Sequence, residues 1–255
     1  MKIHVLSMAH NEAHLLPYFI SHYRNHFPDC EITIFDNEST DETASISQSF
    51  GCKVISVVSG GYVDQILSDT KNEQWKSSQA DWVVVCDIDE FLQINQTELE
   101  KLNDSGVTIL RTQGFDMVGK NGNLEEITDK YPNDWYSKIV CFKRTEIENI
   151  NYTPGAHHCS PTGNIQWSSA AYELFHYKYL SLNLALERIK LRCDRASEDN
   201  RLKGIAYQYY EFNERKTHQE FSQAWRKAIL WRFLKRLLPR EKNYRLGHKL
   251  IAKVP

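Results

Sequence analysis

The sequence of 255 residues contains six cysteines, but no two of them form a Cys-x-x-Cys pair. Scattered cysteines in apolar runs, such as Cys86 and Cys141, are typical of reduced, buried thiols and argue against a disulfide framework. No run of about 18 apolar residues occurs, so the sequence predicts no membrane-spanning helix. The first residues are too polar after Leu6 for a secretory signal. We therefore expect a cytoplasmic protein.

A strong net charge and the glycine-rich phosphate-binding motifs are also missing. The formal net charge of −2 gives no general attraction to nucleic acid. Neither G-x-G-x-x-G nor G-x-x-x-x-G-K-[ST] occurs, so a dinucleotide-binding fold and a P-loop are not supported. The composition is ordinary for a soluble globular protein, and the length suits one large α/β domain with a helical extension.

Strand and helix patterns alternate in short steps along the first third of the chain, which predicts a mostly parallel sheet with right-handed connections. After residue 89 the alternation is looser, and from residue 180 the pattern is mostly helical. We expect an α/β fold whose sheet is flanked by helices, with a C-terminal helical extension. The predicted strands are 2–8, 31–35, 53–58, 82–86, 107–111 and 137–143; the predicted helices are 12–27, 43–50, 64–79, 96–102 and most of 180–238; the predicted loops are 114–135 and 151–167.

The most informative feature is the apolar segment 82–86, which ends in Asp87, Asp89 and Glu90. Such a run reads as a strand buried on both faces. In open α/β sheets ligands lie outside the carboxyl ends of the strands. Carboxylates gathered there raise one another's pKa unless a cation neutralises them, and Mg²⁺ or Mn²⁺ prefers oxygen ligands shared with substrate phosphates. The pattern therefore predicts a divalent-cation site, with a plain polar strand end as the alternative.

Polar side chains follow the other early strands as well. Asn11 and Glu12 follow the first strand, Asp36 and Asn37 end the second, and Asp64 comes after the third. Amides and carboxylates at strand ends can bind the edges of a nucleotide base and the hydroxyls of a ribose. The sequence thus favours a mononucleotide site at this edge of the sheet.

Taken together, these segments resemble GT-A glycosyltransferases of family 2. Segment 6–13 is similar to the apolar, Asn-Glu opening of that family, and segment 36–43 to its D-x-x-S-x-D-x-T stretch. Segment 87–91 resembles the D-x-D-E-F motif of a subgroup related to families 2 and 92. The resemblance implies a catalytic domain over 1–180, divided into a nucleotide-binding half (1–92) and an acceptor-side half (93–180), with a basic helical extension over 181–255.

The resemblance further implies a metal-dependent transfer of a sugar from a nucleotide-sugar donor, UDP-linked, to a hydroxyl of a glycan, lipid-linked or protein-linked acceptor, with inversion. The implied cofactor is Mn²⁺ or Mg²⁺. The family's Glu-Asp dipeptide is missing after Gly114, which leaves the general base open. The implied residues are Asn11, Glu12, Asp36, Asn37, Asp64, Asp87 and Lys138 for the donor, and Asp87, Asp89 and His157 or His158 for the metal. The chemistry itself requires a carboxylate that removes the proton of the incoming hydroxyl, and the candidates are Asp116 first, Asp134 second and Glu90 third.

Two other functions stay open at this point. A haloacid-dehalogenase-like phosphatase also places Asp-x-Asp after an apolar strand, but there the motif closes the first strand and a small residue stands where this chain has Phe91. A catalytically inactive nucleotide- or carbohydrate-binding module would keep the base pocket and lack a working base. Release of the sugar from a nucleotide sugar distinguishes the three.

The C-terminal segment is strongly basic, with ten Lys and Arg residues against one acid over 221–255. Within it, Trp225, Ile229, Phe233 and Leu237 fall on one helical stripe. A cationic amphipathic helix of this kind can lie in an anionic membrane interface, and the alternative is a helix packed on the catalytic domain. We expect peripheral contact with the inner face of a membrane, which suits a lipid-linked acceptor, and no nucleic-acid partner.

Overall fold

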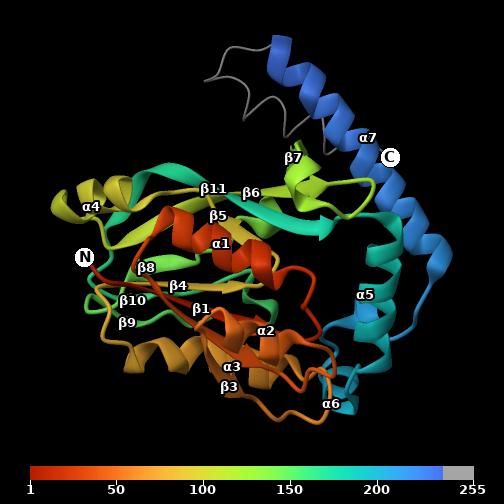
Figure 1. Cartoon of the computed structure of the whole chain (residues 1–255), viewed down its shortest axis with the longest axis horizontal. Helices are drawn as coiled ribbons and strands as arrows, with labels where there is room; N and C mark the ends of the chain where they lie inside the picture. The colour runs from red at the N-terminus through yellow and green to blue at the C-terminus, as the bar shows by residue number, and fades with distance from the viewer. Residues whose placement is uncertain (238–255) are drawn as a thin grey trace.

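The computed structural model describes residues 1–237 and centres on a nine-stranded sheet (Figure 1). Along the sheet the order is β3-β2-β1-β4-β8-β6-β11-β5, and β7 pairs with β6. The first four strands of this order are parallel, as are β6 and β11, whereas β8, β7 and β5 run antiparallel to their neighbours. The predicted mostly parallel α/β sheet is confirmed. The strands are β1 (Ile3–Ala9), β2 (Glu31–Asp36), β3 (Lys53–Ser56), β4 (Trp82–Asp87), β5 (Glu90–Leu92), β6 (Ile109–Val118), β7 (Asp129–Pro132), β8 (Cys141–Lys143) and β11 (Trp167–Tyr179), with β9 (Ile147–Asn149) and β10 (Thr162–Gly163) in a separate pair.

Side chains that alternate along β4 build a hydrophobic core on each face of the sheet. Val84 and Cys86 join the core covered by α1, while Val83 and Val85 join a second core that contains Trp75. Because the strand is buried on both faces, it is apolar along its whole length until Asp87. The α-helices are α1 (Leu16–His26), α2 (Thr43–Ser49), α3 (Asp64–Glu73), α4 (Gln96–Asp104), α5 (Leu182–Asp194), α6 (Glu198–Lys203) and α7 (Glu214–Leu237); the 3₁₀ turns are η1 (Gln74–Ser77), η2 (Leu124–Glu126), η3 (Asp134–Tyr136), η4 (Pro154–Ala156) and η5 (Tyr207–Tyr209).

Two expectations for the second half of the chain are wrong in part. The loop expected from residue 114 begins later, because β6 continues to Val118. Gly114 and Asp116 hide the apolar pattern of β6, although Phe115 and Met117 are buried, and the pairing partner β11 is more than fifty residues away in sequence. The strand expected over 137–143 starts only at Cys141. Strands β5 and β11 were not among the predicted elements.

The C-terminal helices stand at the edge of the sheet toward which the arrowhead of β11 points (Figure 1). The segment after α5 returns to the N-terminal half, where Ala196 forms a bridge with Tyr62. Helix α7 packs along β7 and buries Ala224, Ala228 and Trp231. The predicted helical extension is confirmed up to residue 237, and its remainder lies outside the described residues. Over residues 1–237, no helix combines the length and the apolar character needed to cross a bilayer.

Candidate active site

A cavity of about 740 Å³ lies at the carboxyl ends of the central strands. The carboxyl ends of β1, β4, β6 and β11 contribute to its lining, and α5 contributes one wall. This is the edge at which parallel α/β sheets bind ligands. Of the seven residues expected to bind the donor, every one except Asp36 lines the cavity: Asn11, Glu12, Asn37, Asp64, Asp87 and Lys138.

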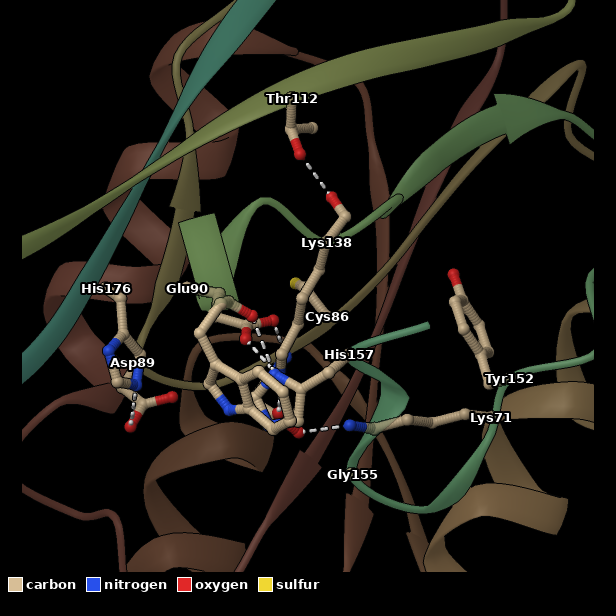
Figure 2. A network of polar contacts seen from close by, with 12 residues as sticks. Lys71, Cys86, Asp89, Glu90, Thr112, Lys138, Tyr152, Gly155, His157 and His176 are labelled. Atoms are coloured by element: carbon tan, nitrogen blue, oxygen red, sulfur yellow. Dashed lines mark hydrogen bonds and ion pairs between the residues drawn. The ribbon is translucent and has the colours of Figure 1, made fainter. Parts of the chain in front are cut away.

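Asp87 at the end of β4 is held between two lysines. Its Oδ1 atom lies 2.5 Å from Nζ of Lys71 and its Oδ2 atom 3.1 Å from Nζ of Lys138. Lys138 is 4% exposed and also reaches Oε1 of Glu90 at 2.6 Å, as Figure 2 shows. Desolvation raises the pKa of Asp87, but the two ammonium groups outweigh it and hold this pKa well below its ordinary value. Asp87 is therefore ionised and already neutralised by the protein.

Asp89 has a different set of partners. Its Oδ2 atom accepts a hydrogen bond from Nη2 of Arg188 at 2.9 Å and lies 3.5 Å from Nε2 of His176. The same Nη2 atom donates to Oε1 of Glu12 at 2.6 Å. Burial would raise the pKa of Asp89, but Arg188 and His176 lower it well below the usual range. Both of these contacts fall on Oδ2 of Asp89.

A second acidic group, Asp116, lies near the carboxyl end of β6 beside β11. Its Oδ1 atom is 2.7 Å from Nδ1 of His176, and its Oδ2 atom accepts hydrogen bonds of 2.7 Å from both the hydroxyl of Tyr131 and Nδ2 of Asn133. The ring of Tyr136 stacks on His176 at 3.6 Å. Burial works to lower the pKa of His176, but Asp89 and Asp116 raise it above its usual value. The pKa of Asp116 is in turn lowered by His176, so each side chain stabilises the charged form of the other.

Of the two adjacent histidines, His157 lines the cavity and His158 does not. Nδ1 of His157 donates to the carbonyl of Trp135 at 2.9 Å, which leaves Nε2 as the unprotonated nitrogen. Burial and then Lys138 lower the pKa of His157 to about 3, so the ring is neutral. A neutral imidazole whose other nitrogen donates to a carbonyl is the usual form of a metal-binding histidine.

The chemistry of these donors fits a divalent cation only if the substrate helps to bind it. No group of three His, Cys, Asp or Glu side chains suited to a metal occurs within residues 1–237, and Asp87 is occupied by Lys71 and Lys138. Asp89 and His157 remain as cavity-lining donors. Mg²⁺ typically binds through one or two carboxylates together with substrate phosphates and water, and the residues present fit that mode.

The opposite end of the cavity carries groups suited to a base and a ribose. Asn37 is buried, donates through Nδ2 to the carbonyl of Val57 at 2.9 Å and accepts from Nη2 of Arg195 at 3.0 Å. Asp64 is 7% exposed and accepts a hydrogen bond from the backbone N–H of Gly155. Asp36, the remaining expected residue, stays outside the cavity lining.

Two of the expected catalytic residues do not reach the cavity. Glu90 is 1% exposed and bonded to Lys138 and to the backbone N–H of Asp87, and Asp134 is exposed on η3. Sequence reasoning missed most of the cations in the lining. A signal was available for Arg188, Arg192 and Arg195, because this spacing places the first two on one face of α5 and the third, its C-cap residue, on the same side. The wall formed by α5 also means that the expected boundary at residue 180 does not separate the cavity from the extension.

Comparisons with known proteins agree with the sequence resemblance. The model of the family described as glycosyl transferase family 2 matches residues 5–175. No curated protein matches significantly. Among solved structures, S. aureus TarS is 14% identical, with a TM-score of 0.46 over 94% of this chain and 50% of that one, so this chain spans about half its length.

Two further solved structures are similar over different shares of the chain. S. aureus TarS 1-349 in complex with UDP-GlcNAc is 15% identical, with a TM-score of 0.43 over 92% of this chain and 81% of that one. Glucosyl-3-phosphoglycerate synthase from Mycobacterium tuberculosis, in complex with Mn²⁺, UDP and glucosyl-3-phosphoglycerate, is 23% identical, with a TM-score of 0.30 over 44% of each chain. Since the family model matches well over half of the sequence, the chain belongs to glycosyl transferase family 2.

Proposed function

We propose that the protein transfers a sugar from a nucleoside-diphosphate sugar, UDP-linked, to a hydroxyl group of an acceptor. The observation that supports this most is the cavity at the ends of β1 and β4, where Lys71, Lys138 and Arg188 surround Asp87 and Asp89. Breaking the bond between sugar and phosphate leaves a diphosphate, whose charge fixed cations stabilise. Family membership and the buried polar end at Asn37 favour the same donor class.

In the proposed reaction the acceptor oxygen attacks the anomeric carbon, and the bond from that carbon to the phosphate oxygen breaks. The electron pair stays on the diphosphate, and the acceptor proton passes to a base. We assign the base to Asp116, which His176 orients through its hydrogen bond, because Asp116 alone of the three expected catalytic carboxylates lines the cavity. In this role Asp116 removes a proton and does not attack the anomeric carbon, so the single displacement inverts that centre.

A divalent cation, Mn²⁺ or Mg²⁺, would be held by Asp89 and His157 together with the donor phosphates. When bound, it would supply a Lewis acid for the leaving group. The protein's own cations complement it, since Lys71 and Lys138 already offset the charge of Asp87.

Aromatic side chains and α7 bear on the acceptor. Trp135 is 56% exposed at the cavity, and Tyr136 lines it as well; their ring faces can stack on a sugar. On α7 the predicted stripe is divided, because Trp225 packs against the core that contains Trp231, whereas Phe233 is 57% and Leu237 78% exposed. Apolar side chains among basic ones support peripheral contact with an anionic membrane, and hence a glycan or lipid-linked acceptor.

A thermal-shift screen tests the donor site. UDP-, GDP- and CMP-sugars are each added with Mn²⁺ or with EDTA to the wild type, to Asp89→Asn and to the control Asp29→Asn, which changes an exposed aspartate in the turn after α1. We expect stabilisation by UDP-sugars that depends on the cation and is lost in Asp89→Asn alone. Hydrolysis of phosphomonoesters without a nucleotide response would indicate the phosphatase, and donor binding without release of UDP in the presence of acceptors would indicate the inactive module.

A further inference from the structure

Seven lysines and arginines line the cavity, and they differ in their partners. Arg195 lies 3.5 Å from Oε2 of Glu38, and Arg192 donates to the hydroxyl of Tyr209 at 2.7 Å. Lys71, Lys138 and Arg188 each form an ion pair with an acid in or beside the Asp87–Asp89 motif. Lys178 and Lys227 line the same cavity, yet no carboxylate of residues 1–237 lies within the 4.0 Å of an ion pair from either ammonium. The charge of Asp116 acts on Lys178 from beyond ion-pair distance, and both oxygens of Asp116 are already hydrogen-bonded to other side chains. A partly buried ammonium group without a direct ionic partner gains stability when a ligand supplies an anion.

The two lysines reach the cavity from β11 and from α7. Lys178 follows His176 by two residues on β11, and both line the cavity, whereas Tyr177 between them packs on Phe91 with ring centroids 4.7 Å apart. Lys227 reaches the cavity from α7, which packs on β7. This places the pair beside the proposed base rather than beside the motif at the end of β4.

A tyrosine ring lies beside each of the two ammonium groups. Nζ of Lys178 lies 4.9 Å from the ring centroid of Tyr179, and Nζ of Lys227 lies 5.7 Å from that of Tyr131. Both tyrosines are buried in one small core with Trp231, and the hydroxyl of Tyr131 donates to Asp116. The rings therefore fix the two lysines at a wall of the cavity that continues to Asp116.

We propose that Lys178 and Lys227 bind an anionic group, a phosphate or a carboxylate, on the acceptor, close to the hydroxyl that receives the sugar. This inference rests on the proposed transferase function. Lys71, Lys138 and Arg188 lie at Asp87 and Asp89, where the donor diphosphate is proposed to bind. A separate pair of ammonium groups near Asp116 therefore serves a second anion. An ammonium group that meets such an anion forms a charge-assisted hydrogen bond.

The test is calorimetric titration of the protein saturated with UDP and Mg²⁺, so that the donor site is filled. The probes are matched neutral and anionic pairs: glucose with glucose 6-phosphate, glycerol with glycerol 3-phosphate, and galactose with galacturonate. We expect the anionic member of at least one pair to bind more tightly by about 10-fold or more, the size of one charged hydrogen bond. The pair that responds distinguishes phosphate from carboxylate.

Variants locate the effect. Lys178→Gln and Lys227→Gln are each expected to weaken binding of the anionic probe by about 10-fold, with the affinity for UDP and for neutral sugars unchanged. Lys227→Arg keeps the charge and should retain binding, and Lys190→Gln removes an exposed ammonium of α5 and should have no effect.

Two results would overturn the inference while leaving the transferase proposal intact: equal affinity for neutral and anionic probes, or a loss of UDP affinity in Lys178→Gln, which would assign the lysines to the donor. Failure of the wild type to bind UDP at all would instead refute the proposed function, and this inference with it.

Discussion

The ammonium group of Lys138 allows a sharp test of how the site is held together. It lies 2.6 Å from Oε1 of Glu90 and 3.1 Å from Oδ2 of Asp87, and the lysine is 4% exposed. Methionine is similar in length and shape and carries no charge. Lys138→Met therefore leaves two carboxylates close together without their shared cation, one of them shut off from water.

The magnitude depends on which of these ion pairs is buried. The side chain of Glu90 is 2% exposed, whereas that of Asp87 is 31% exposed and keeps Lys71 at 2.5 Å as a second partner. Most of the loss therefore comes from Glu90. Removing one partner of a buried ion pair costs about 3–5 kcal/mol, a large part of the roughly 5–15 kcal/mol by which domains are stable. For a chain of this size that corresponds to a fall in Tm of about 6–20 °C.

The assay is urea unfolding at pH 7, followed by circular dichroism. The double variant Lys138→Met/Glu90→Gln removes the stranded charge and should recover about 2 kcal/mol or more of the loss. Lys190→Met, which removes an exposed ammonium of α5, should change the free energy of unfolding by less than about 0.5 kcal/mol. A loss below about 1 kcal/mol in the single variant, or a double variant no more stable than the single one, would refute the view that a buried, uncompensated carboxylate sets the cost.

Three further predictions concern the Asp116–His176 pair, the turn at Gly155 and His157, and α7. The pKa of His176 is raised in the folded protein, so its charge adds stability that is complete below the unfolded pKa of about 6.5 and is lost as the pH rises through the folded pKa. The difference in unfolding free energy between wild type and His176→Gln should therefore shrink from pH 6 to pH 9, and a constant difference would contradict this prediction. Gly155 has φ +77°, and an added Cβ would lie 2.9 Å from the imidazole of His157, whereas a Cβ at Gly60 (φ +65°) would meet no atom within 4 Å. Both alanine variants should lose about 1–2 kcal/mol of stability. Gly155→Ala alone should weaken the effect of Mn²⁺ on UDP binding, as measured by titration. Phe233→Asp should reduce flotation of the protein with phosphatidylserine vesicles by roughly 10-fold. The control Phe50→Asp changes another exposed phenylalanine and should not reduce flotation. Equal binding of the two variants would exclude membrane contact through α7.

Much of the first half of the site could be predicted because it depends on local pattern. An apolar segment that ends in Asp87 and Asp89 is recognisable as a buried strand with a polar end, and the parallel arrangement then places Asn11, Asn37 and Asp64 at the same edge. These residues line the cavity as expected. The second half was less predictable, because β6 is interrupted by Gly114 and an acid and owes its length to pairing with β11.

Local sequence by itself thus determined the α/β class, the family resemblance and the carboxylates at the strand ends, since these follow from residue order and side-chain period. Only the tertiary structure decided the partners of those carboxylates. Arg188 is 99 residues from Asp89, and His176 is 60 residues from Asp116. No periodicity encodes such contacts, because they arise when separate strands and α5 pack at one sheet edge. The charge balance of the cavity, and with it the proposed anion-binding site at Lys178 and Lys227, therefore depends on the fold and not on any single motif.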